Sequence, residues 1–299
     1  MTRARSVPIY SECNLECEAS PLTSQSTQAQ SRYVEANGQR LHYRRWSADG
    51  PPLIFLHGVT SSATSWDEIA PEFAADYSVM AFDLRGHGLS SKPAEGYSWA
   101  DHYAADMVDF LRSHVNEPAV LVGHSLGAVV TAPVAVEVPD RVRCIVMEDP
   151  PAFASSEDHA RTQDRFEPVL ALKRMRYEER LARLVDALNG DQRAAQRRAD
   201  SLETMAEQVL VELLAGENAY RPDDWFPRVS CPSLVILGNP DKGAVVRGED
   251  RPRLTSLLRD SRLVEWKDVG HSIHAEQPQR FVAEVRAFLD SMGTRTALS

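Results

Sequence analysis

The sequence lacks long apolar runs, an excess of basic residues and a leader-like start. No run approaches the roughly 18 apolar residues that a membrane span needs. Residues 1–20 are too mixed and polar to form the apolar core of a signal peptide. The formal net charge of -10 disfavours a nucleic-acid partner, because a polyanion would be repelled. We therefore expect a cytoplasmic protein with neither a membrane nor a nucleic-acid partner.

Cysteine is also scarce, with four among 299 residues. Cys13 and Cys17 are spaced C-x3-C in a polar segment, and no two further ligands of the kind a zinc site needs lie close by in the sequence. Cys144 and Cys231 lie in or beside apolar segments, which is typical of buried free thiols. The cysteines therefore predict no metal site.

The length and the 43% hydrophobic content fit one large globular domain with room for an inserted subdomain. Residues 1–30 are predicted to form a disordered tail, because the repeated Ser, Thr and Gln of residues 20–31 leave almost nothing to bury. Order is expected to begin near Tyr33. Asn37-Gly38 then predicts a hairpin turn between residues 32–35 and 39–46.

Short apolar segments alternate with amphipathic ones along the rest of the chain. The apolar segments predict strands at residues 52–56, 79–82, 119–122, 142–147, 233–237 and 262–266. The amphipathic or small-residue segments predict helices at residues 66–75, 99–114, 126–138 and 279–292. Strands that alternate with helices predict an α/β fold with a mostly parallel central sheet and helices on both faces.

One block interrupts this alternation. Residues 151–227 contain no strand pattern and instead predict helices at residues 165–189 and 199–214. We interpret the block as a helical cap inserted into a core formed by residues 31–150 and 228–295. The many arginines of the block are interpreted as solvated helix faces.

Gly-His-Ser-Leu-Gly at residues 123–127 is the most informative motif, because it fits the nucleophile-elbow pattern G-x-S-x-G. A predicted strand leads into it and a predicted helix leads out. A sharp strand-to-helix turn exposes the serine oxygen at a helix N-terminus, which favours developing negative charge. The flanking glycines remove side chains that would block the turn. The motif predicts Ser125 as a nucleophile.

A nucleophilic serine needs a base, an orienting acid and donors for an oxyanion. His271 is the candidate base, since it follows the last predicted strand at the edge where strand carboxyl ends meet. Asp149 and Asp241 each follow a strand at that edge and precede His271, so both are candidates for the acid. The backbone N–H groups of Val59 and Leu126 are the candidate oxyanion donors.

The chain resembles the α/β-hydrolase fold superfamily, and within it the capped serine hydrolases of the esterase and lactonase kind. The resemblance covers about residues 33–292 and rests on His57-Gly58, the DLRGHGLS segment at residues 83–90, the elbow and Gly270-His271. It implies an acyl-enzyme intermediate, no cofactor and a cap that controls access. Some members carry the acid after the strand that follows the elbow helix, so the resemblance favours Asp149, with Asp241 as the alternative.

A serine at the elbow indicates acyl chemistry, because related enzymes that cleave epoxides or haloalkanes place aspartate there. We expect a small to medium apolar carboxylic ester or lactone as substrate. The alternative is a hydrolase of C–C bonds in β-diketone or meta-cleavage compounds, which would use the same triad. A minor alternative is a non-catalytic small-molecule receptor on this fold. The oligomeric state stays open.

Overall fold

The computed structural model describes residues 28–153, 156–216, 220–248 and 250–296. Residues 1–27 of the predicted tail, including Cys13 and Cys17, lie outside the described residues, and the first strand begins at Gln30. Cys144 is buried and Cys231 is half-buried, and both are free thiols. Among the helices of the described residues, none combines the length and apolar character that crossing a lipid bilayer requires.

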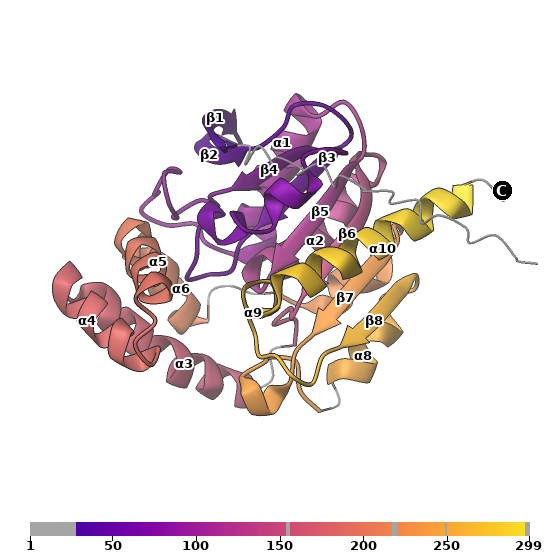
Figure 1. Ribbon diagram of the computed structural model, residues 1–299. Coiled ribbons are helices and arrows are strands. Elements are labelled where there is room, and N and C mark those ends of the chain that lie inside the picture. The colour runs from indigo at the N-terminus through magenta and orange to yellow at the C-terminus, as the bar shows by residue number, and fades with distance from the viewer. Residues whose placement is uncertain (1–27, 154–155, 217–219, 249, 297–299) are drawn as a thin grey trace, which may run out of the picture.

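Eight strands form one twisted, mostly parallel sheet, which confirms the predicted fold class (Figure 1). The strand order is β1-β2-β4-β3-β5-β6-β7-β8, and only the pairs β1-β2 and β2-β4 are antiparallel. The strands are β1 (Gln30–Ala36), β2 (Gln39–Arg45), β3 (Pro52–Leu56), β4 (Ser78–Phe82), β5 (Ala119–His124), β6 (Val142–Glu148), β7 (Ser233–Leu237) and β8 (Ser261–Glu265).

The predicted hairpin joins β1 to β2. Asn37 and Gly38 have φ angles of 48° and 69°, and Ala36 pairs with Gln39 across the turn. Two successive residues with positive φ match the turn type whose twist suits adjacent antiparallel strands, and Asn-Gly adopts it at little steric cost. The sequence therefore fixes the register of this edge hairpin locally.

The parallel strands are apolar throughout because they are covered on both faces. Along β3, Ile54 and Leu56 belong to one buried core, whereas Leu53 and Phe55 belong to a second core on the opposite face. Side chains of a strand alternate between faces, so a strand buried on both faces has no polar side. The same division continues through β5 and β6.

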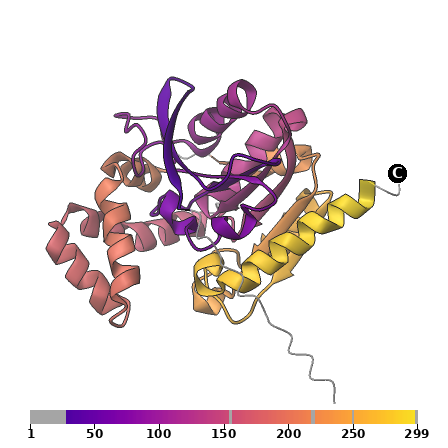
Figure 2. The same cartoon turned by 45° about the horizontal axis from the view of Figure 1, so that its top comes forward.

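Helices cover the two faces of the sheet. Residues of α1 (Ala104–His114), α2 (Leu126–Glu137) and α8 (Asp250–Leu257) pack into the first core. Residues of α10 (Pro278–Thr296) pack into the second, and Figures 1 and 2 show this helix lying along β7 and β8. The remaining short elements of the core are η3 (Trp99–Tyr103), η4 (Pro139–Arg141), η5 (Phe226–Arg228), η6 (Pro240–Lys242) and α9 (Ile273–Glu276).

The helix predicted at residues 66–75 is wrong in form. Two short 3₁₀ helices, η1 (Ala63–Trp66) and η2 (Ala70–Phe73), stand in its place. Pro71 would lie inside the predicted helix, where it lacks the N–H that a continuous helix needs. The apolar side chains that suggested the helix, such as Trp66 and Phe73, are nevertheless buried in the second core.

Five α-helices precede η5 in the described residues between β6 and β7. They are α3 (Ser156–Arg174), α4 (Tyr177–Ala187), α5 (Gln192–Thr204), α6 (Glu207–Ala215) and α7 (Pro222–Trp225). Figures 1 and 2 show α3–α5 beside the sheet as a layer of their own, and we call α3–α6 the helical cap. No strand occurs among the described residues of this block.

The two long helices predicted within the cap are each broken in two. The backbone is extended at Arg176 between α3 and α4, and again at Met205 and Ala206 between α5 and α6. The second break fixes the cap to the core, because Ala206 N donates a 2.7 Å hydrogen bond to Gly86 O. Neither break carries a proline or glycine, so the periodicity of the sequence continues across both.

We expect Gly127→Ala to lower the free energy of unfolding by about 1–3 kcal/mol, the usual range for overpacking. A Cβ at this position would overlap the backbone carbonyl of Leu56, which the central sheet holds in place. Gly293→Ala is the matched control. Its Cβ would meet no atom at this exposed position of α10, so helix propensity should raise stability by about 1 kcal/mol. Urea denaturation measures both, and equal effects would contradict the steric account.

Candidate active site

Ser125 lies on a strained turn between β5 and α2. Its φ and ψ are 52° and −114°, outside the regions that most residues adopt. A Cβ at Gly123 would overlap the backbone of Gly127, so the chain can turn this sharply only with glycines there. Ser125 N donates a 2.9 Å hydrogen bond to Glu148 O at the end of the neighbouring strand β6. The elbow is thereby tied to the next strand of the sheet.

His271 and Asp149 meet directly. The distance between His271 Nδ1 and Asp149 Oδ2 is 2.6 Å, and the Asp149 side chain is fully buried whereas that of His271 is 14% exposed. Asp149 is the first residue after β6 and has a positive φ of 41°. Because β5 and β6 are paired in parallel, Ser125 and Asp149 occupy equivalent places just past adjacent strand ends.

The surroundings of Asp149 hold its carboxylate in place. Asp149 N donates to Ile236 O on β7 (2.9 Å), and Val245 N donates to Asp149 Oδ2 (2.8 Å). The other oxygen, Oδ1, is buried and accepts no hydrogen bond from the described residues. The carboxylate is therefore oriented toward His271 by the backbone of two further segments.

Asp241, the alternative acid, lies elsewhere. It is exposed on η6, and its backbone N–H bonds to the side chain of Asn239 in a local turn. It lines a separate hollow of about 230 Å³ together with Arg251 and Glu265. Within the described residues, Asp241 has no hydrogen bond or ion pair with His271.

Val59 and Leu126 have free backbone N–H groups, since neither donates a hydrogen bond within the described part of the chain. The loop that carries Val59 is fixed against the elbow, because Gly127 N donates to His57 O (3.1 Å). His87 Nε2 lies 2.8 Å from Val59 O, and this hydrogen bond fixes the carbonyl group of Val59. Two unused donors thus border the elbow, one on each side.

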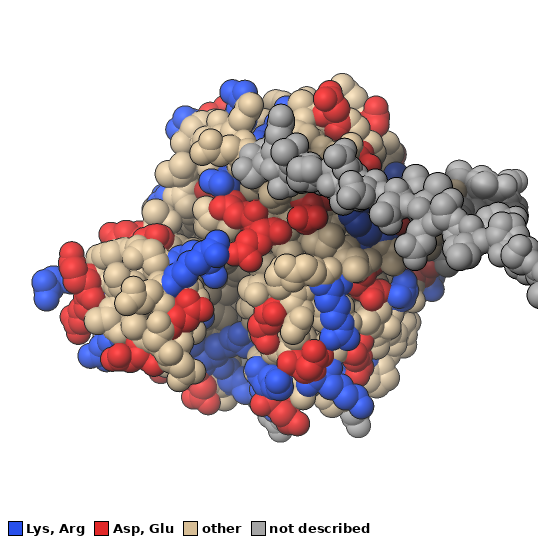
Figure 3. All heavy atoms as spheres, in the orientation of Figure 1, with Lys and Arg blue, Asp and Glu red and all other residues tan. Residues whose placement is uncertain are grey.

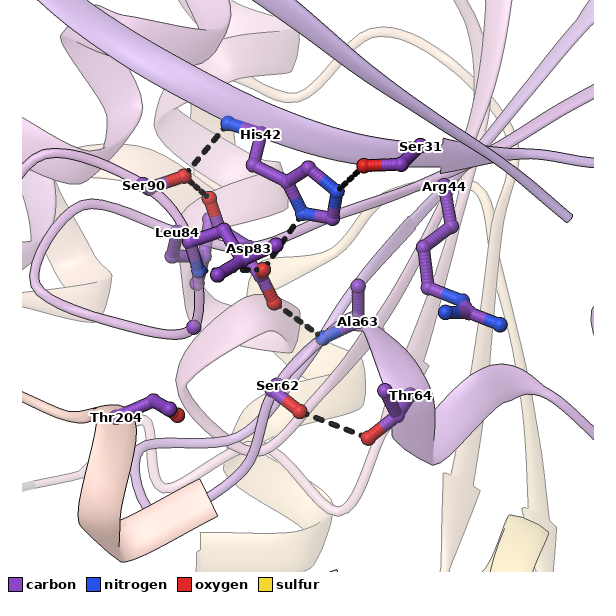
Figure 4. Close-up of polar contacts among 12 residues, drawn as sticks. Ser31, His42, Arg44, Ser62, Ala63, Thr64, Asp83, Leu84, Ser90 and Thr204 are labelled. Atoms are coloured by element: carbon purple, nitrogen blue, oxygen red, sulfur yellow. Dashed lines mark hydrogen bonds and ion pairs between the residues drawn. The ribbon is translucent and has the colours of Figure 1, made fainter. Parts of the chain in front are cut away.

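A buried aspartate, Asp83, braces the loop that follows Val59 (Figure 4). Its carboxylate accepts hydrogen bonds from Ala63 N (2.7 Å), Leu89 N (2.9 Å) and His42 Nδ1 (2.7 Å). Burial alone would raise the pKa of Asp83, but the hydrogen bonds from His42 and from the two backbone N–H groups bring it well below its usual range. The fixed negative charge therefore anchors three chain segments at one point.

The family of the chain follows from comparison with known proteins. Residues 53–285 match the family described as "Alpha/beta hydrolase family", which is more than three quarters of the sequence. The chain belongs to the alpha/beta hydrolase family. The match contains the elbow, both loops that border it and the Asp149–His271 pair.

Relatives of this alpha/beta hydrolase are named as hydrolytic enzymes. It is 26% identical to N-formylmaleamate deformylase of Pseudomonas putida over 274 residues, which cover 86% of this chain and 95% of the relative. It is 36% identical to 2-(acetamidomethylene)succinate hydrolase of Mesorhizobium japonicum over 127 residues, 42% of this chain and 45% of the relative's length. A crystal structure of E-2-(acetamidomethylene)succinate hydrolase matches with a TM-score of 0.77 and 25% identity, over 88% of this chain and 99% of the other. Family and relatives together identify a hydrolase.

A second histidine–carboxylate pair lies behind the site of the hydrolase. His274 Nδ1 contacts both oxygens of Glu148 (2.9 and 2.8 Å), and His274 N donates to the same carboxylate (2.9 Å). His124 Nε2 donates to His271 O (3.1 Å) and joins this group to the candidate base. His124, Glu148 and His274 are residue types that bind metals, but these hydrogen bonds occupy them with one another and with the His271 backbone.

The sequence analysis missed this second pair, although a signal was present. Glu148 and Asp149 are consecutive acids at the end of a strand, and His271 and His274 are spaced by three residues in the loop that faces them. Two acids beside two histidines at one sheet edge indicate two pairs rather than one.

Three other histidine side chains of the hydrolase favour the neutral form. Burial lowers the pKa of His57 to about 3, with repulsion from His87 as a smaller cause. Burial likewise lowers the pKa of His87 and brings that of His124 well below its usual value. A histidine with a lowered pKa binds its proton more weakly in the folded state than in the unfolded state.

The free energy of unfolding should therefore fall as the pH is lowered below about 6.5, where the unfolded chain begins to take up protons on these histidines. His57 alone, with a pKa of about 3, predicts a loss of about 1 kcal/mol between pH 7 and pH 5.5, and His87 and His124 add to this loss. Urea denaturation across this range measures the loss, and calorimetry measures the protons taken up on unfolding. A flat stability profile would contradict the neutral assignment.

Proposed function

We propose that the protein is a serine hydrolase that cleaves a carboxylic ester or lactone through an acyl-enzyme intermediate. Ser125 would be the nucleophile, His271 the general base and Asp149 the orienting acid. The observation that carries the proposal is the 2.6 Å hydrogen bond between His271 Nδ1 and Asp149 Oδ2, formed at the end of the strand adjacent to the one that leads into the strained Ser125. This connectivity supports nucleophilic catalysis of acyl transfer.

The hydrogen bond also determines which nitrogen acts. A carboxylate only accepts hydrogen bonds, so His271 Nδ1 carries the proton and Nε2 keeps its lone pair. Nε2 takes the proton of Ser125 Oγ as this oxygen attacks the substrate carbonyl. His271 then gives that proton to the leaving group, and in the second half it activates the water that releases the acid and restores Ser125.

The oxyanion forms where free backbone donors are available. The N–H groups of Val59 and Leu126 would donate hydrogen bonds to the developing oxyanion, and the N-terminus of α2 favours the same negative charge. Donors held by the sheet and by His87 need no rearrangement during the reaction. Such fixed donors stabilise the charge of the transition state without first having to reorganise, which is the main contribution of an oxyanion hole to the rate.

The relatives support hydrolysis without deciding the bond. One is named a deformylase and another a hydrolase, and the deformylase aligns over 95% of its length. The serine nucleophile favours an ester or lactone for this chain. The same residues would also serve a C–C bond hydrolase of diketones, so this alternative is included as an arm of the test below.

We expect Asp149→Asn to lower kcat by about 10³–10⁴-fold, because an amide would favour the wrong tautomer of His271. Asp241→Asn, the matched control, should stay within about twofold of the wild type, since Asp241 is exposed and makes only local contacts. A panel of 4-nitrophenyl esters, lactones and a vinylogous diketone measures both variants. Equal activity of the two variants would contradict the assignment of the acid.

A fluorophosphonate probe tests the nucleophile independently of the substrate. We expect intact mass spectrometry to show one adduct, with peptide mapping to Ser125, and no adduct in Ser125→Ala. An adduct on another serine would contradict the proposal. Turnover of the diketone alone would favour the C–C alternative, and the absence of both adduct and turnover would favour a receptor.

A further inference from the structure

The arginines of the helical cap fall into two groups. Arg165 on α3 and Arg198 on α5 form no ion pair within the described part of the chain. Other cap arginines are paired with acids: Arg174 with Glu207, Arg180 with Glu203, Arg183 with Glu179, and Arg193 and Arg197 with Glu68. Arg176, exposed at the start of α4, is a third cap arginine without an ion pair among the described residues, so it is their placement toward the core that singles out Arg165 and Arg198.

Arg198 lies near the loop of the candidate oxyanion hole. Ser201 is one turn further along α5, and its Oγ is 3.5 Å from Ser62 Oγ in the loop that begins with Val59. Residues three apart on a helix share a face, so Arg198 lies on the side of α5 that meets this loop. Arg197, four residues before Ser201, shares this face but is paired with Glu68, which leaves Arg198 as the arginine there without an acidic partner.

Arg165 and Arg247 approach the same region from two other segments. Val169, one turn after Arg165, is buried in the core cluster that also contains Val59, so this face of α3 is directed at the core. Arg247 follows two residues after Val245, whose N–H binds the Asp149 carboxylate. Three basic side chains thus come from α3, α5 and the loop after η6.

The electrostatic interactions agree with this placement. Arg165 and Arg198 are exposed to solvent, yet enough protein surrounds each that desolvation lowers its pKa. For Arg165, the Asp149 carboxylate raises the pKa, whereas the charges of Arg198 and Arg247 lower it. Arg165 is therefore close enough to all three groups to interact with their charges. Figure 3 shows basic side chains in the hollow between the cap and the core.

We propose that Arg165 and Arg198, together with Arg247, form a carboxylate-binding subsite beside Ser125. The substrate would then carry a free carboxylate a few bonds from the carbonyl that is cleaved. Guanidinium groups suit this ligand, because their donors match the two oxygens of a carboxylate. The inference rests on the proposed function for the identity of the reacting bond, and it replaces the apolar substrate expected from the sequence with an anionic one.

The test compares mono-(4-nitrophenyl) succinate with its methyl ester, which has the same shape without the charge. We expect the wild type to prefer the charged ester. Arg165→Gln and Arg198→Gln should each lower kcat/KM for the charged ester by about 10- to 100-fold, mainly through KM. The neutral ester should change by less than about threefold, which also shows that the variants fold.

Arg197→Gln is the matched control, because it removes the same charge from the adjacent position of α5, where the side chain faces Glu68. It should leave the preference for the charged ester intact. Equal effects of Arg197→Gln and Arg198→Gln, or no preference in the wild type, would overturn the inference while the proposed function stood.

Calorimetric titration with succinate separates the two proposals. Binding by the wild type that is lost in Arg165→Gln and Arg198→Gln, without turnover of either ester or labelling of Ser125, would support the subsite and contradict the proposed function. Turnover of the neutral ester without succinate binding would contradict the subsite alone.

Discussion

The parallel pairing of β5 with β6 is the constraint on which the site depends. It brings the carboxyl ends of the two strands together. The hydrogen bond from Ser125 N to Glu148 O is the last one between them, just past the paired residues His124 and Glu148. The backbone then turns sharply after each strand, with a positive φ at Ser125 after β5 and at Asp149 after β6. Such angles are unfavourable for these residues, so the sheet must hold them. The strained residues are therefore Ser125 and Asp149 themselves, which follow adjacent strands at the same edge of the sheet.

The loop after β8 is held by the same strand end. Side chains of β6 alternate between faces, so Glu148 is directed into the second core, whereas the buried Asp149, just past the strand, turns toward His271. Each acid binds one histidine of the loop: Glu148 binds His274 and Asp149 binds His271. Trp66 stacks on His274 with ring centroids 4.3 Å apart and completes its burial. The pair of Glu148 with His274 therefore fixes the loop, and His271 is left partly exposed.

Local sequence signals predicted the strands, the Asn-Gly hairpin and the elbow, because each depends on residues that are neighbours in the chain. They could not choose between Asp149 and Asp241, since both follow a strand at the same sheet edge and both suit a turn. The difference is made by distant groups: Val245 N and His271 bind Asp149, whereas Asp241 bonds only within its own turn. The breaks in the cap helices were missed for the same reason, because the one after α5 is fixed by Gly86 of the core.

The sequence composition predicts that the cap arginines lie on solvated helix faces, and this prediction describes only some of them. It suits Arg193 and Arg197, which lie in the open and pair with Glu68. It does not account for Arg165, whose charge interacts with Asp149 and with two other arginines. A protein of net charge -10 repels anions at long range, so an anionic substrate would need a local region of opposite potential to enter the site. Guanidinium groups without acidic partners provide that potential, whereas groups already paired with a carboxylate largely cancel it.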